Sequence, residues 1–151
     1  MHLAQINVAR LLRPLDHPGT ADFVAALAPV NAIADAAPGF VWRLQTEDGD
    51  ATAIRVLDDD LVIVNLTVWE SLEALRAFVF DGRHLEVLRR RRDWFERRPG
   101  PASVLWWIPP GTLPTPQEGL RRLALLAEHG ATPEAFDFAH PFEPVAQIPV
   151  Q

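Results

Sequence analysis

Polar and aromatic side chains that can bind an organic molecule alternate with aliphatic ones along residues 61–69. With a period of two, Asn65, Thr67 and Trp69 share one face of a predicted strand, and the opposite face is aliphatic. A buried amide or hydroxyl without a hydrogen-bond partner costs about 1–3 kcal/mol, so these groups need a protein, water or ligand partner. The asymmetry between the two faces predicts a cavity on the polar one.

Two other predicted strands carry polar side chains in the same alternating way. The predicted pocket residues are Gln5, Asn7, Arg43, Asn65 and Thr67, with Trp69 at the rim and Trp106 or Trp107 closing one wall. Such a mixture suits an aromatic or polyketide-like ligand that carries carbonyl or phenolate oxygens. In the alternative interpretation, the polar groups satisfy one another across the sheet or lie in a dimer interface.

A titratable residue and an arginine run occur on the helix predicted for residues 84–97. A free histidine titrates near neutral pH, and His84 lies at the helix start, which favours the neutral form that acts as a general base; the alternative is a surface histidine. The run 89–92 is expected to form weak ion pairs with nearby carboxylates in solvent. Arg92, one turn after Leu88, is the member best placed to point inward and bind a substrate carboxylate or phenolate.

The elements that must position these residues follow from periodicity and turn signals. The predicted strands are 3–10, 40–46, 51–57, 61–69 and 103–108, and helices are predicted over 20–36, after Ser71, over 84–97 and from Thr115 onward. Thr115, Pro116 and Glu118 have the spacing of a capped helix start. The order predicts an α+β domain over 1–138, with an antiparallel sheet and helices packed on its aliphatic face, followed by a proline-rich tail over 139–151.

Composition excludes several classes of function. The chain of 151 residues has a net charge of −6 and no cysteine, and all 14 of its basic residues are arginine. The acidic charge argues against nucleic-acid binding, and no apolar run approaches the ~20 residues of a membrane span. The histidines form no metal-ligating pattern, and no nucleotide-binding loop occurs. We expect a cytoplasmic protein that binds a small molecule and contains no metal.

Several segments carry a resemblance to a known family. They are MHLAQINVARL, APGFVWRLQTEDG, VNLTVWESLEALRAFVF, RHLEVLRRRRDWFER, VLWWIPPG and ATPEAFDF. In these motifs, up to about Phe138, the chain resembles the DUF3291 family. That family is similar to the dimeric α+β barrel superfamily, whose ferredoxin-like subunits pair through their sheets and hold a ligand cavity between sheet and helices. The resemblance implies a ferredoxin-like fold and a homodimer, with the sheets of the two subunits face to face.

Antibiotic-biosynthesis monooxygenases of that superfamily suggest a chemistry. They are similar to this chain in an asparagine and a tryptophan near the end of one strand, which match Asn65 and Trp69. The resemblance implies cofactor-free oxygenation, in which a deprotonated phenol reduces oxygen directly and Asn65, Asn7 and Arg43 stabilise the oxyanion. The alternative is that Trp69 only anchors packing.

Haem enzymes of the superfamily suggest a different function. They resemble this chain in an asparagine on the first strand, matched by Asn7, and in the helix that follows Trp69. They also use a second tryptophan and a histidine ligand, whose positions fall here near Phe78 and Leu88, so His84 lies one turn early. Haem binding therefore stays an alternative, as does a ligand-binding protein without catalysis.

Overall fold

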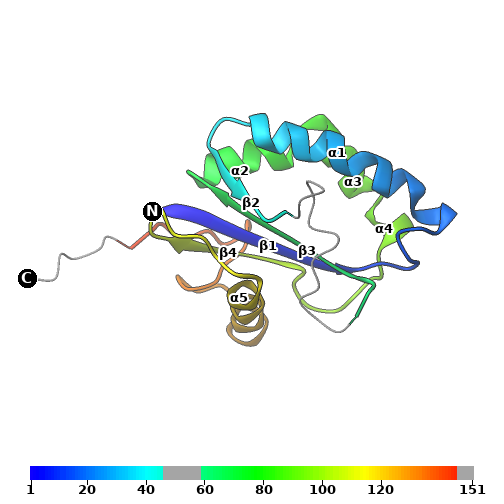
Figure 1. Ribbon diagram of the computed structural model, residues 1–151. Coiled ribbons are helices and arrows are strands. Elements are labelled where there is room, and N and C mark those ends of the chain that lie inside the picture. The colour runs from blue at the N-terminus through cyan, green and yellow to red at the C-terminus, as the bar shows by residue number, and fades with distance from the viewer. Residues whose placement is uncertain (46–58, 146–151) are drawn as a thin grey trace, which may run out of the picture.

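The computed structural model describes residues 1–45 and 59–145, which form one sheet and the helices around it (Figure 1). The elements are β1 (His2–Arg10), η1 (Pro18–Thr20), α1 (Ala21–Ala36), β2 (Phe40–Arg43), β3 (Val62–Trp69), α2 (Leu72–Val79), α3 (Gly82–Arg89), α4 (Arg91–Trp94), β4 (Ser103–Ile108) and α5 (Pro116–His129). The strand predicted over 51–57 and the turn before it lie outside the described residues.

The four described strands form an antiparallel sheet in the order β2-β3-β1-β4. A strand–helix–strand unit with another strand inserted between its two strands is the ferredoxin-like arrangement. The register between β1 and β3 pairs Gln5 with Thr67 and Asn7 with Asn65. The predicted fold class, a ferredoxin-like α+β domain, is confirmed.

Local signals set the helix starts. The Ser71 side chain accepts a 3.1 Å hydrogen bond from the Ala74 amide, and Thr115 accepts one of 3.1 Å from the Glu118 amide, as the sequence predicted. The helix predicted over 84–97 is instead two elements. It begins at Gly82, because the Asp81 side chain caps it, and it breaks at Arg90 before the single turn of α4.

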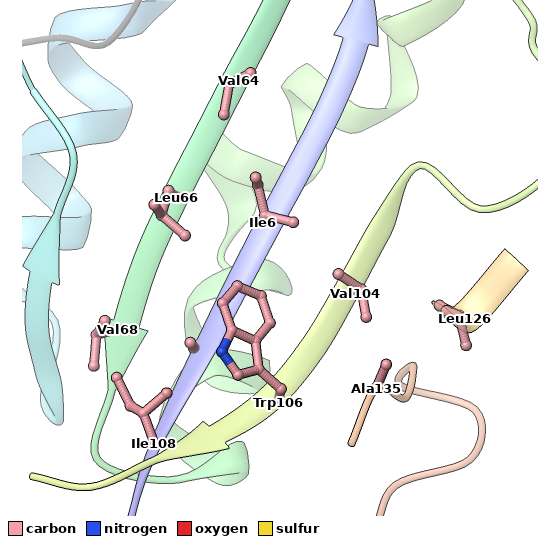
Figure 2. Close-up of a cluster of buried hydrophobic side chains, with 10 residues drawn as sticks. Ile6, Val64, Leu66, Val68, Val104, Trp106, Ile108, Leu126 and Ala135 are labelled. Atoms are coloured by element: carbon pink, nitrogen blue, oxygen red, sulfur yellow. The ribbon is translucent and has the colours of Figure 1, made fainter. Parts of the chain in front are cut away.

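The distribution of helices over the two faces of the sheet differs from the prediction in one respect. Helices α1, α2 and α3 lie together on one face, as expected, but they cover the polar face, and α5 lies on the opposite side (Figure 1). The aliphatic face forms a cluster with α5 and the segment after it (Figure 2), made of Ala4, Ile6, Val64, Leu66, Val68, Val104, Trp106, Ile108, Leu126 and Ala135. The expectation that these helices pack on the aliphatic face was wrong. Both faces of the sheet are covered, and it is α5 that packs on the aliphatic one.

A glycine allows the close contact between α5 and the sheet. A Cβ atom at Gly119 would come within 2.5 Å of Cδ1 and 3.2 Å of Cβ of Ile6, which is fully buried on β1. The absence of a side chain at this position therefore sets how near α5 approaches the strands.

The segment after α5 also packs on the domain. The backbone of Phe136 pairs with Leu105 of β4, and its ring lies 5.9 Å from that of Phe142. Residues 141–145 have no regular secondary structure. Among the described residues, no helix is long and apolar enough to cross a membrane.

Candidate functional site

An open cavity of about 740 Å³ lies between the polar face of the sheet and helices α1, α2 and α3. Its apolar lining comes mainly from Phe23, Leu27, Val30, Leu75, Phe78 and Val79. Polar side chains enter from β1 and β3, the charged Arg43 from β2, His84 from α3, and further charged side chains from α4 and the segment after it. A mostly apolar cavity with a few convergent polar groups is the usual form of a small-molecule site.

Three of the predicted pocket residues form a hydrogen-bonded chain. Trp69 Nε1 donates to Thr67 Oγ1, and Thr67 Oγ1 donates to Gln5 Oε1, both over 2.9 Å. An indole N–H can only donate, so Thr67 has one hydroxyl proton left, which it gives to Gln5. The carbonyl oxygen of the Gln5 amide is thereby occupied, and its NH2 group is the part that remains for the cavity that Gln5 lines.

Two asparagines lie side by side on the cavity floor. Asn7 of β1 and Asn65 of β3 are direct cross-strand partners, and both line the cavity. Both side chains are exposed, and neither makes a hydrogen bond to any residue within 1–45 or 59–145. Their amide groups are therefore available to a ligand. Gln5 and Thr67 instead hydrogen-bond to each other across the sheet, as the alternative interpretation expects for the polar groups.

Arg43 lines the cavity with its side chain held in place by a carboxylate. Its Nε and Nη2 atoms donate to Asp35 Oδ1 and Oδ2 of α1 over 2.7 and 3.2 Å. The Arg43 side chain is only 10% exposed. The paired carboxylate offsets much of the guanidinium charge, so Arg43 presents a rigid but partly compensated cation.

His84 is half-buried in the cavity wall. Its Nδ1 atom lies 3.0 Å from the Val79 carbonyl oxygen, which can only accept, so the neutral ring carries its proton on Nδ1 and has a lone pair on Nε2. Burial lowers the pKa of His84 below its ordinary value, while the Val79 carbonyl and the Asp81 charge act in the opposite direction. The lowered pKa favours the neutral ring, which is the form a general base requires.

A row of aromatic rings supports His84. Its ring centroid lies 4.8 Å from that of Phe78, which stacks at 5.2 Å on Trp69, and Phe40 meets Trp69 edge-on at 5.4 Å. Trp69 is fully buried behind Phe78 and does not line the cavity. The expectation of Trp69 at the rim was wrong, and the alternative role of a packing anchor describes its position.

Neither tryptophan of β4 closes a wall of the cavity. Trp106 is fully buried on the opposite, aliphatic face, in the cluster beneath α5 (Figure 2). Trp107 lies on the polar face, but its Nε1 donates over 2.7 Å to the Phe142 carbonyl and its ring packs near Phe136. The C-terminal segment therefore occupies the place next to Trp107 that the prediction gave to a ligand.

The arginine run divides into two kinds of residue. Arg90 donates to Asp22 over 3.0 Å and to Asp93 over 3.1 Å and lies 4.7 Å above the Trp94 ring, so it joins α4 to α1. Arg91 and Arg92 line the cavity while remaining exposed. The prediction placed Arg92 inward; it lies at the cavity but on the solvent side.

Other cavity residues were not singled out by sequence reasoning. They are Asn31 of α1, Phe78 of α2, and Arg97 and Arg98 after α4. Asn31 had a detectable signal, because it follows Leu27 by four residues and is polar on an apolar helix face. Phe78 was noted only as the place near which the haem enzymes have their second tryptophan.

Solved structures with the same fold include an oxygenase. SnoaB from Streptomyces nogalater, a cofactor-independent oxygenase, is 21% identical, with a TM-score of 0.51 over 76% of this chain and 98% of that one. A Nitrosomonas europaea protein, provisionally named antibiotic biosynthesis monooxygenase, is 18% identical, with a TM-score of 0.51 over 74% and 93%. Rv0793 from Mycobacterium tuberculosis is 14% identical, with a TM-score of 0.50 over 74% and 100%. These likenesses support the fold.

Comparison with curated protein sequences gives no match. A family model described as a domain of unknown function, DUF3291, matches residues 2–150, which is nearly the whole chain. The chain therefore belongs to the DUF3291 family.

Proposed function

We propose that this protein binds a small aromatic molecule in the cavity and oxygenates it without a cofactor. The observation that carries the proposal is the lining of one cavity by both a neutral, half-buried His84, whose Nε2 has no hydrogen-bond partner among the described residues, and the two asparagine amides on its floor. The fold shared with SnoaB, a cofactor-independent oxygenase, supports this class of chemistry.

In the proposed reaction, His84 Nε2 removes a proton from an acidic phenol or an activated CH2 group of the ligand. The resulting carbanion-like enolate gives one electron to O2, and the two radicals combine into a carbon-bound peroxide. The O–O bond breaks as the carbon loses its remaining hydrogen as a proton, and the hydroxide that leaves takes up a proton to form water, giving a ketone or quinone. One oxygen atom enters the product, the other leaves as water, and the substrate supplies all the electrons.

Amide donors would stabilise the negative charge that develops on the substrate oxygen. We assign this role to Asn7 and Asn65, with the Gln5 NH2 group as a third donor, because donors fixed in a protein need no reorganisation during the reaction. Arg43 adds a fixed cation to the wall, weakened by Asp35. Thr67 holds Gln5 and acts only through it.

Oxygen consumption tests this proposal. The metal-free protein is incubated with anthrone-like and hydroquinone compounds under 18O2, and we expect uptake above background with one labelled atom in the product. His84→Gln should reduce the rate by about 10²–10⁴-fold, the range of general-base catalysis. His140→Gln, at an exposed histidine outside the cavity lining, is the matched control. A rate unchanged by His84→Gln would contradict the role of this residue.

Haem binding is a second candidate, favoured by one observation. His84 lines the cavity and its Nε2 atom has no partner among the described residues, so this nitrogen could bind iron as an axial ligand. Titration with haem separates the two proposals. A Soret band that His84→Ala abolishes, together with no oxygen uptake on any phenol, would favour haem.

We also retain the two-fold homodimer as a proposal. Helix α5 contacts β4, β1 and β3, while Trp42 of β2 and Leu44 just after that strand are only partly buried beside the same aliphatic face. A second copy of the sheet would cover them, since apolar patches of this kind mark interfaces. Light scattering that returns the 16.8 kDa of one chain at micromolar concentration would contradict a dimer.

A further inference from the structure

The charged residues around the cavity are unevenly balanced. The lining includes Arg91, Arg92, Arg97 and Arg98, and the carboxylate that lines the cavity with them is Glu96. Glu96 is already paired with Arg10 of β1. Within the described residues, the cavity lining therefore carries an excess of positive charge, although the whole chain has a net charge of −6.

Two nearby arginines that have a structural role are each paired with two carboxylates. Arg10 is held by Asp59 and Glu96, and Arg90 by Asp22 and Asp93. The exposed side chains of Arg91, Arg92 and Arg97 make no hydrogen bond or ion pair with any residue that the structure describes. Arg98 differs, since its charge helps to lower the pKa of Asp59.

The unpaired arginines lie beside an apolar cavity. A guanidinium binds an oxyanion such as a carboxylate through two parallel N–H bonds, and the adjacent low-dielectric wall strengthens the attraction. We propose that the ligand of this cavity is an amphipathic aromatic acid, whose ring lies near His84 and whose carboxylate or equivalent oxyanion binds Arg91 and Arg92. This inference rests on the cavity being the ligand site of the proposed function, but it does not depend on oxygenation.

The two ends of the proposed ligand contact different helices. His84 lies near the start of α3, and Arg91 begins α4, seven residues later and beyond the break at Arg90. The ring of the ligand therefore lies against α3 and its acid group against α4.

A pair of fluorescent probes tests the inference without any chemistry. 1-Anilinonaphthalene-8-sulfonate is anionic, and N-phenyl-1-naphthylamine has the same aromatic skeleton without the sulfonate. We expect the double variant Arg91→Gln/Arg92→Gln to raise the Kd of the anionic probe at least tenfold at low salt and to change that of the neutral probe less than twofold. Added salt should weaken only the anionic probe. Arg89→Gln, an exposed arginine outside the lining, is the matched control and should change neither.

A second pair of variants tests whether the probes bind in the cavity. Ala26 lines the cavity and Ala25 is exposed on the same helix, so Ala26→Phe should weaken both probes and Ala25→Phe neither. Equal weakening of both probes by the double arginine variant, or an unchanged Kd for the anionic probe, would overturn the inference. Failure of both probes to bind the wild-type protein would overturn it as well. Charge-selective binding without oxygen uptake would retain it and reject the oxygenase.

Discussion

Thr67 and Gln5 are joined by a 2.9 Å hydrogen bond across β3 and β1, directly beneath the cavity. Both residues are buried, and Thr67 also accepts from Trp69, so a single hydroxyl connects the buried indole to an amide at the cavity surface. The bond fixes which end of the Gln5 amide is left to meet a ligand.

Replacing Thr67 with valine should therefore destabilise the protein. Thr67→Val keeps the shape but leaves Trp69 Nε1 and Gln5 Oε1 without a partner, at a cost of about 1–3 kcal/mol in the free energy of unfolding. Chemical denaturation measures the loss. In a double-mutant cycle with Gln5→Leu, the combined cost should be less than the sum of the single costs, and strict additivity would argue against the bond.

Replacing Asn65 with alanine should leave stability nearly unchanged but weaken ligand binding. The Asn65 side chain is exposed and has no partner among the described residues, so Asn65→Ala should change the free energy of unfolding by no more than about 0.5 kcal/mol. Ligand affinity or turnover should fall, because the lost partner is the ligand. Asn7→Ala should behave in the same way. A stability loss as large as that of Thr67→Val would assign Asn65 to the scaffold instead.

The lowered pKa of His84 predicts how stability depends on pH. The unfolded chain takes up a proton on this residue as pH falls through about 6.5, whereas the folded protein resists protonation because the ring is buried. Below pH 6.5 the unfolded state binds more protons, so stability falls with decreasing pH until the folded-state pKa is reached. Denaturant midpoints between pH 7.5 and 5 should decrease more for wild type than for His84→Gln. Parallel curves would mean that His84 titrates as in the unfolded chain.

The same shift predicts the acid limb of any base-catalysed activity. A general base works in its neutral form, so oxygen uptake should persist below the ordinary histidine pKa and decline only at the lower pKa of His84. Measurement of kcat/KM against pH checks this prediction. A decline centred above pH 6.5 would point to another titrating group.

Gly119 should be intolerant of a methyl group. Alanine normally stabilises a helix by about 1 kcal/mol relative to glycine, but here its Cβ would lie 2.5 Å from a side-chain atom of the fully buried Ile6. We expect Gly119→Ala to cost about 1–3 kcal/mol through overpacking. Gly82→Ala is the matched control, since a Cβ there would meet no atom within 4 Å, and it should be neutral or stabilising.

Much of the local structure could be predicted from the sequence, because its causes are local. The caps at Ser71 and Thr115 depend on groups three residues away, and the strand over Ser103–Ile108 has the bounds that its neighbours indicate. Alternation along β3 also placed Asn65 and Thr67 on one face. The break at Arg90 was missed, since it accompanies contacts with Asp22 and Trp94 that no local pattern contains.

The candidate site could be predicted only as a set of residue types sharing a face. Asn7, Asn65, Gln5, Thr67, Arg43, His84 and Arg92 all reach the cavity, but sequence could not tell that Thr67 and Gln5 satisfy each other while the asparagines do not. That difference depends on the register between β1 and β3, which joins residues 62 positions apart.

By itself the sequence determined which side chains share a face, because the periods of strands and helices are properties of the backbone. Tertiary structure decided what covers each face. Periodicity does not distinguish a face buried by α5 from one buried by α1. It could therefore not predict that Trp106 lies in the aliphatic core, that Trp69 lies behind Phe78, or that His84 lines the cavity. These placements depend on which helix crosses to which side of the sheet, and long-range packing sets that choice.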